Sequence, residues 1–100
     1  MGYIDCMSDW FKVEETGDEL QTAIMTLKPG ASSGPMSNEH AQSEQVLYVV
    51  SGEVTAEVGN RTWVMRSGDS TIVPRKVPHR FRNDGTEAAV TFNVYGPPAY

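Results

Sequence analysis

The sequence predicts an all-β fold, a sandwich or barrel of about seven or eight short strands. Runs of roughly four to eight residues rich in β-branched and aromatic side chains recur along the chain, and many of them alternate apolar with polar positions. Turn-forming residues interrupt these runs every eight to twelve residues or so, which is the spacing of short connections between strands. No segment places apolar residues at i, i+3, i+4 and i+7, so no helix is expected.

Three strands are predicted in the first half of the chain, with one long loop between the second and the third. Trp10–Glu15 alternates apolar with polar residues, and Leu20–Leu27 is a longer β-favouring run that stops at a Lys-Pro-Gly turn. Positions 29–38 read PGASSGPMSN, and this stretch is predicted to hold no regular element. Gln45–Ser51 (QVLYVVS) is the strongest strand, because it is dense in β-branched and aromatic residues, and it ends at Gly52.

Five further strands are predicted after this one. Glu53–Val58 and Arg61–Met65 flank a Gly-Asn pair, and a two-residue hairpin turn is expected there because both residue types tolerate φ > 0. Ser70–Val73 is a short strand, and two prolines then bracket a tight connection to His79–Arg82. Glu87–Tyr95 is the last strand, closed by Gly-Pro-Pro.

The chain is predicted to be one domain, residues 1–100, in which residues 1–8 form a loose arm. At 39% apolar and 21% charged residues, its composition is that of a soluble globular protein. No apolar run is long enough to span a bilayer, and no signal peptide is evident, so no membrane association is expected. The single cysteine, Cys6, excludes an intrachain disulfide and indicates the cytoplasm. The net charge of −5 argues against nucleic acid as a partner.

Both histidines lie at junctions between a loop and a strand. Alternation along His79–Arg82 puts the two arginines on one face, so with the arginines in water His79 faces inward. His40 ends the Gly/Pro/Ser-rich loop, just before the strongest strand. An inward histidine is either a hydrogen-bonded core residue or a ligand. If the strands close into a barrel, both imidazoles can point into its mouth, where they suit a first-row divalent metal ion.

Two spacings make the chain resemble a small single-domain cupin of the conserved-barrel type. One is similar to G-x5-P-x-G-x2-H-x3-N, with a lysine where the family has its middle glycine. Its positions hold Gly68, Pro74, Lys76, His79 and Asn83. The other is similar to H-x-H-x(3,4)-E-x6-G. Its positions hold Asn38, His40, Gln45 and Gly52. The resemblance implies a double-stranded β-helix, or jelly-roll barrel, of six to eight strands or so.

The resemblance also implies a divalent transition metal, Zn, Ni, Fe, Mn or Cu, held by Asn38, His40, Gln45 and His79. This ligand set carries no anion, and carboxamide oxygens are weaker donors than imidazole or carboxylate. A weakened, partly degenerate site is therefore expected. For Asn38 the alternative is a loop residue whose side chain caps local backbone groups.

Two functions follow from the resemblance. One is a metal-dependent enzyme, an isomerase, lyase or dioxygenase, that acts on a small anionic or sugar-derived molecule. The other is a non-catalytic barrel that binds a ligand or effector at a decayed metal site. For the enzyme, Arg75 and Lys76 are predicted to clamp a carboxylate. The alternative is that these basic residues solvate an exposed strand face. Lys76 stands where glycine would allow φ > 0, and a lysine there would carry about 1 kcal/mol of strain.

A homodimer is also expected. Thr22–Leu27 and Ala88–Tyr95 carry no charge, and an uncharged sheet edge invites pairing with a second chain. Residues 1–11 include several apolar side chains, which either lie across a two-fold partner or fold back over the chain's own barrel end.

Overall fold

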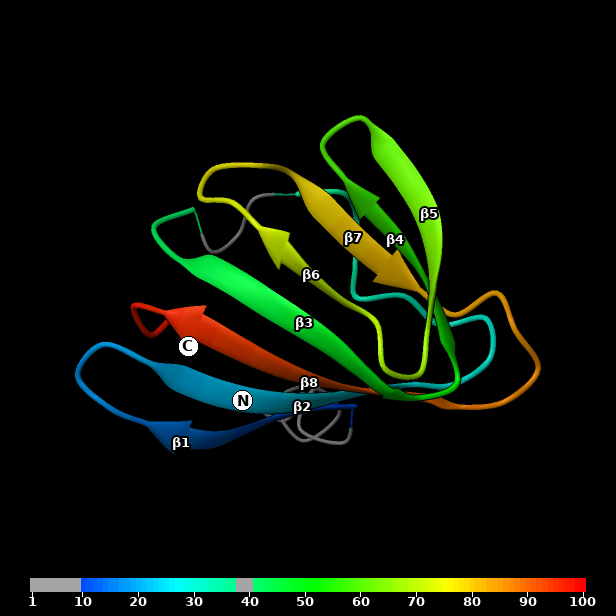
Figure 1. Cartoon of the computed structure of the whole chain (residues 1–100), viewed down its shortest axis with the longest axis horizontal. Helices are drawn as coiled ribbons and strands as arrows, with labels where there is room; N and C mark the ends of the chain where they lie inside the picture. The colour runs from blue at the N-terminus through cyan, green and yellow to red at the C-terminus, as the bar shows by residue number, and fades with distance from the viewer. Residues whose placement is uncertain (1–9, 38–40) are drawn as a thin grey trace.

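The computed structural model describes residues 10–37 and 41–100, and it confirms the all-β prediction. Antiparallel strands form two sheets (Figure 1). In chain order the strands are β1 Phe11–Thr16, β2 Gln21–Leu27, β3 Glu44–Ser51, β4 Glu53–Val58, β5 Arg61–Arg66, β6 Ser70–Val73, β7 His79–Arg82 and β8 Ala89–Gly96. In the part of the chain that the structure describes, no helix is long and apolar enough to cross a membrane.

The two sheets share one core. The larger sheet has the order β1-β2-β8-β3-β6, and the smaller has the order β5-β4-β7. Alternation places the inward side chains of both sheets against one another, as in any pair of packed sheets. The largest fully buried apolar side chains are Phe81, Leu27, Leu47 and Met65. The interior is therefore built from residues of β2, β3, β5 and β7, which come from both sheets.

Gly52 is the corner at which the chain passes from the larger sheet into the smaller one. It separates β3 from β4, and Figure 1 shows β3 running to this corner. Its φ is +81°, which favours glycine. A Cβ atom here would lie 2.7 Å from the carbonyl oxygen of Ala88 and 2.9 Å from the Cα of Ala89. Glycine is therefore required at this position by both the backbone angle and the close approach of β8.

The Gly/Pro/Ser-rich loop lies along β7 and forms backbone hydrogen bonds with the edge of that strand. It contains isolated bridges, Ser32 to Arg82 and Ser37 to His79, and not a regular strand, in agreement with the prediction. The amide of His79 donates to the carbonyl of Ser37 at 2.8 Å, and the amide of Ser37 donates back at 3.2 Å. These bonds fix the backbone on both sides of the inward-facing His79 ring.

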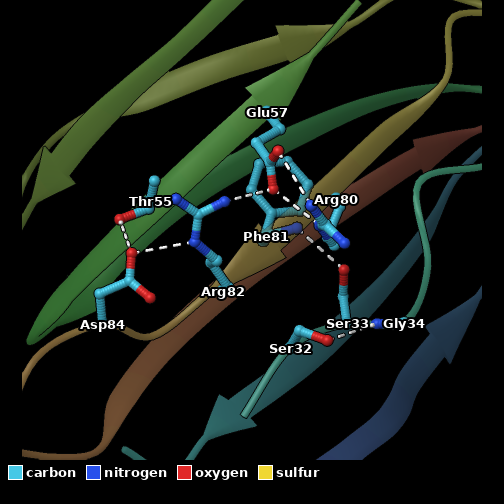
Figure 2. A network of polar contacts seen from close by, with 9 residues as sticks. All are labelled: Ser32, Ser33, Gly34, Thr55, Glu57, Arg80, Phe81, Arg82 and Asp84. Carbon is cyan, nitrogen blue, oxygen red and sulfur yellow. Dashed lines mark hydrogen bonds and ion pairs between the residues drawn. The ribbon is translucent and has the colours of Figure 1, made fainter. Parts of the chain in front are cut away.

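The outward face of β7 carries an ion-pair network (Figure 2). Arg80 binds both carboxylate oxygens of Glu57, at 2.7 and 3.0 Å, and Arg82 bridges Glu57 and Asp84 at 2.6 and 2.9 Å. The hydrogen bond from Arg80 is the main reason why the pKa of Glu57 lies below its ordinary value. The arginines face outward as predicted, but they are half-buried and paired, and they hold β7 so that His79 points inward.

The predicted open edges are wrong. β2 pairs with both β1 and β8, and β8 pairs with both β2 and β3, so the two uncharged strands are interior strands. They lack charge because neighbouring strands cover both of their edges. The edges of the larger sheet are β1 and β6.

The outer face of the larger sheet exposes apolar side chains. Outward positions of β3, β6 and β8 retain between 37% and 58% of their accessible surface. They are Val46, Tyr48, Val50, Ile72 and Phe92. The homodimer stays a prediction, and this face, not an open edge, is the apolar surface that a second copy would cover.

Lys76 has a φ of +67°, and it is the only residue other than glycine with a positive φ in residues 10–37 and 41–100. The loop therefore has, at this position, the positive φ that the family's glycine would allow. We expect Lys76→Gly to raise the free energy of unfolding by about 1 kcal/mol, because glycine adopts this angle without a Cβ clash. Urea unfolding measures the change. Lys76→Ala is the control, since it removes the exposed charge and keeps the Cβ; equal stability of the two variants would contradict the strain.

Candidate functional site

A cavity of about 210 Å³ lies between the two sheets, and two of the residues predicted as metal ligands line it. Gln45 enters it from β3 in the larger sheet, and His79 enters it from β7 in the smaller sheet. These strands are not neighbours in either sheet, so the closure of the barrel brings the two side chains to one cavity. The other lining residues are Trp10, Phe11, Met25, Ser33, Pro35, Phe81, Tyr95 and Tyr100.

His79 is held in a defined orientation by the backbone. Its side chain is buried, with 8% of the residue's surface exposed, as alternation predicted. Nδ1 lies 3.0 Å from the carbonyl oxygen of Val77. Because a carbonyl only accepts, Nδ1 carries a proton, and in the neutral ring Nε2 is then the nitrogen with a lone pair. A backbone carbonyl that accepts the other ring N–H is the usual support of a metal-binding histidine.

Gln45 is oriented by a residue that the sequence reasoning missed. Its Nε2 donates to Oδ1 of Asn93 at 2.9 Å, and Nδ2 of Asn93 donates to Thr91 Oγ1 at 3.0 Å. Asn93 is fully buried. With Nε2 fixed in this way, Oε1 is the amide atom of Gln45 that can accept a hydrogen bond or coordinate an ion. The signal for Asn93 was a polar residue at an inward position of an otherwise apolar strand, TFNVY.

The remaining predicted ligands, Asn38 and His40, lie outside the described residues. Within residues 10–37 and 41–100, three or more His, Cys, Asp or Glu side chains nowhere gather as a metal-binding group. The complete ligand set therefore stays a prediction. The described residue before this segment, Ser37, is paired with His79, and Gln45 stands four residues after Ala41 in the sequence.

Arg75 and Lys76 are not among the described residues that line the cavity. Nε of Arg75 donates to the carbonyl oxygen of Gln42 at 3.0 Å, and its guanidinium lies 4.0 Å from the carboxylate of Glu44. Lys76 is exposed on the loop between β6 and β7. In this structure Arg75 is directed to the backbone carbonyl of Gln42, and the carboxylate clamp stays a prediction.

One wall of the cavity is a cluster of aromatic rings. Phe11 and Tyr100 have ring centroids 4.7 Å apart, and Tyr95 lies 5.1 Å from Tyr100 in an edge-to-face arrangement. The buried Gln21 holds the end of this cluster, since its Oε1 accepts from the amide of Tyr100 and its Nε2 donates to the carbonyl of Tyr100. Trp10 and Phe11 therefore pack on their own barrel. The rest of the predicted arm, residues 1–9, lies outside the described residues.

Three comparisons place the chain among known proteins. The family model described as Cupin domain matches residues 23–95. The chain is 31% identical over 85 residues to Polyketide synthase CurC of Streptomyces cyaneus, a match that covers 73% of this chain and 55% of the relative. The chain thus spans about half the length of this curated relative.

The solved structures agree with the family match. An RmlC-like cupin from Shewanella frigidimarina NCIMB 400 superposes with a TM-score of 0.76 at 24% identity, covering 88% of this chain and 75% of that one. A putative sugar phosphate isomerase from Acidithiobacillus ferrooxidans superposes with a TM-score of 0.70 at 26% identity, covering 80% and 51%. These likenesses confirm the double-stranded β-helix that the two motifs predicted.

Proposed function

The chain belongs to the cupin domain family, and from this premise we propose that its cavity binds a small organic molecule beside a divalent transition metal ion. Asn38, His40, Gln45 and His79 would hold the ion. The observation that carries the proposal is the orientation of His79: its ring lines the cavity, and its Nδ1–H is bound to the Val77 carbonyl, which leaves Nε2 as the nitrogen that a neutral ring could use for coordination. Zn, Ni, Fe, Mn and Cu all accept imidazole nitrogen.

The described donors fit such an ion by their chemistry. Oε1 of Gln45 and, in the neutral ring, Nε2 of His79 are uncharged atoms with lone pairs, and the bond from Gln45 Nε2 to Asn93 orients the amide. A bound ion would act as a Lewis acid and polarise a carbonyl or enolate oxygen of the ligand. Because the proposed ligand set supplies no negative charge, a ligand with an ionisable oxygen would complete the site.

The names of the relatives bear on the class of ligand. A polyketide-type molecule carries repeated carbonyl groups that enolise readily, so it offers such an oxygen, in keeping with the relative named as a polyketide synthase. A sugar phosphate, suggested by the name of the isomerase, calls for cationic side chains. The described lining of the cavity contains no Lys or Arg. It also contains no Asp or Glu, so its residues support binding more directly than proton transfer by a carboxylate base.

Elemental analysis of the protein, purified without an affinity tag, tests the proposal. We expect close to one equivalent of a first-row transition metal per chain, or its uptake on titration with Zn²⁺, Ni²⁺, Fe²⁺, Mn²⁺ or Cu²⁺. The full chain is used, because Asn38 and His40 complete the proposed ligand set. A protein that is purified without metal and takes up none of the five ions would overturn the metal site.

A further inference from the structure

We infer that residues 97–100 form a strap across one wall of the cavity, and that this strap releases from Gln21 to admit a ligand while the barrel stays folded. The strap follows β8 and belongs to no strand. Figure 1 shows the chain turning back beside β8 after this strand ends. The inference rests on the proposed function only in taking the cavity as a ligand site.

The strap explains a polar residue at an inward position of β2. Gln21 is buried there, with 1% of its surface exposed. The other inward positions of this strand are apolar and hold Ala23, Met25 and Leu27. Burial of an amide side chain is unfavourable unless its donors and acceptors are bonded. Oε1 of Gln21 accepts from the amides of Ala99 and Tyr100, at 3.0 and 2.8 Å, and its Nε2 donates to the main-chain oxygen of Tyr100 at 2.9 Å. The glutamine side chain therefore bonds the strap in place of a neighbouring strand.

The strap places the ring of Tyr100 in the aromatic wall of the cavity. The centroid of this ring lies 4.7 Å from that of Phe11 and 5.1 Å from that of Tyr95, and all three residues line the cavity. Met25 also lines the cavity and is buried, with 3% of its surface exposed. Release of the strap would take Tyr100 out of this wall and open a path to the buried lining residues.

The strap can leave without breaking a sheet. β2 pairs with β8 along its whole length, and residues 97–100 take no part in this pairing. The bonds to Gln21 are made by a side chain, and water can replace them on both partners. Tyr100 is already 54% exposed, so its release uncovers less apolar surface than the release of a core ring would. Segments with these properties open locally at a lower free-energy cost than the whole domain.

The end of the strap next to β8 is fastened separately. Oγ of Ser43 donates to the carbonyl of Pro97 at 2.6 Å, and Ser43 stands directly before β3. This bond does not involve Gln21. The strap can therefore swing about its Pro97 end, which stays at the start of β3 when Tyr100 moves away from the cavity.

Thiol labelling of an introduced cysteine tests the inference. Met25→Cys places a thiol in the cavity, and Val49→Cys places one at a fully buried core position that is not among the described residues lining the cavity. Both are made in a chain that carries Cys6→Ser, so that the introduced thiol alone reacts with an aromatic disulfide reagent, dithiobis(nitrobenzoate). We expect the thiol at position 25 to react at least about tenfold faster than the thiol at position 49, because the strap opens more often than the domain unfolds.

A matched pair of substitutions assigns the release to Gln21. Gln21→Leu keeps a side chain of similar size and removes its bonds to Ala99 and Tyr100, so it should speed labelling at position 25 by about tenfold or more. Thr16→Val is the control, because it removes the bond from Nε2 of Gln21 to Oγ1 of Thr16 and leaves the strap bonds in place. It should change the rate by less than about threefold.

Labelling at position 49 in the same backgrounds reports any change in global stability. Equal rates at positions 25 and 49 in the unaltered Gln21 background would overturn the inference. So would a Gln21→Leu chain in which labelling at position 25 rises no more than labelling at position 49.

Amide hydrogen exchange in the unaltered chain gives a second measurement, which does not depend on the folding of a variant. The amides of Ala99 and Tyr100, both bonded to Gln21, should exchange at least about tenfold faster than the most protected amides of β8. Equal protection would mean that the strap opens only when the barrel unfolds, and the inference would be wrong.

Neither measurement uses a metal ion or a ligand, so this inference and the metal proposal can fail separately. If position 25 is labelled as expected and the chain takes up no metal, the strap stands and the metal site fails. If metal is taken up and labelling at position 25 follows global unfolding, the metal site stands and the strap fails.

Discussion

His79→Ala is expected to abolish metal binding by the full chain and to leave the domain folded. His79 supplies the imidazole among the described donors, and Nε2 is the atom prepared for coordination by the bond from Nδ1 to Val77. Loss of a supporting outer-shell group alone weakens a metal site by about 10- to 100-fold, so loss of a ligand should weaken it by at least about 100-fold. Titration with Zn²⁺ and Ni²⁺ measures this loss.

The fold should survive this change for a structural reason. The backbone of His79 is held by its bonds to Ser37, which alanine retains. The loss of the side-chain hydrogen bond to the Val77 carbonyl has an expected cost of about 1 kcal/mol. Thermal unfolding followed by circular dichroism checks this. A variant that loses metal only because it is unfolded would not support the assignment.

The opposite change at the neighbouring ligand gives a matched comparison. Gln45→Glu places a carboxylate, the family's residue, at the second described donor. The added charge should tighten metal binding by about tenfold or more, although the bond to Asn93 must rearrange. His79→Ala with unchanged affinity, or Gln45→Glu with weaker affinity than the unaltered chain, would contradict the proposed site.

Alternation along His79–Arg82 was enough to predict which residues of that strand face the core. It put His79 and Phe81 on the inner face of one strand, and both are buried. The predicted bounds of the strands were less accurate where a side chain from outside a strand forms a hydrogen bond with its backbone. The last strand was predicted to begin at Glu87 but begins at Ala89, because the carbonyl of Glu87 accepts a hydrogen bond from the side chain of Asn83.

The order of the strands could not be read from the sequence. The lack of charge in β2 and β8 was interpreted as a sign of an open edge, but both are interior strands, and native edge strands usually carry charges that prevent pairing with another chain. The sequence also did not show where the loop between β6 and β7 directs its side chains. Arg75 donates to the carbonyl of Gln42 and is not among the described residues that line the cavity. Such local hydrogen bonds depend on which loops meet, and the motif spacing does not contain that information.

The motif spacing predicted the position of Asn83 but not its structural role. Its side chain is buried, with 1% of the residue's surface exposed. Nδ2 donates to the carbonyls of Leu27, at 2.9 Å, and Glu87, at 2.7 Å, and Oδ1 accepts from the amide of Gly85 at 2.8 Å. Asn83 thus joins three parts of the chain: the end of β2, the segment that leads into β8, and the turn after β7. It supports the barrel and does not line the cavity.

Asn83→Asp is therefore expected to lower the free energy of unfolding by about 3 kcal/mol or more near neutral pH, although the two side chains have the same shape. A carboxylate would face the carbonyl oxygens of Leu27 and Glu87 where an N–H₂ group now donates to both. Burial beside these oxygens should raise the pKa of the new carboxyl in the folded state above its unfolded value of about 3.9. The protonated form can donate to one carbonyl, so the loss of stability should be smallest below about pH 4 and should grow as the pH rises through the folded pKa.

Urea unfolding at about pH 4 and pH 7 measures this loss of stability. Asn60→Asp at the exposed hairpin turn is a control of equal charge, and it is expected to change stability by less than about 0.5 kcal/mol. If the two variants were equally stable at pH 7, Asn83 would not have the supporting role that its three hydrogen bonds indicate.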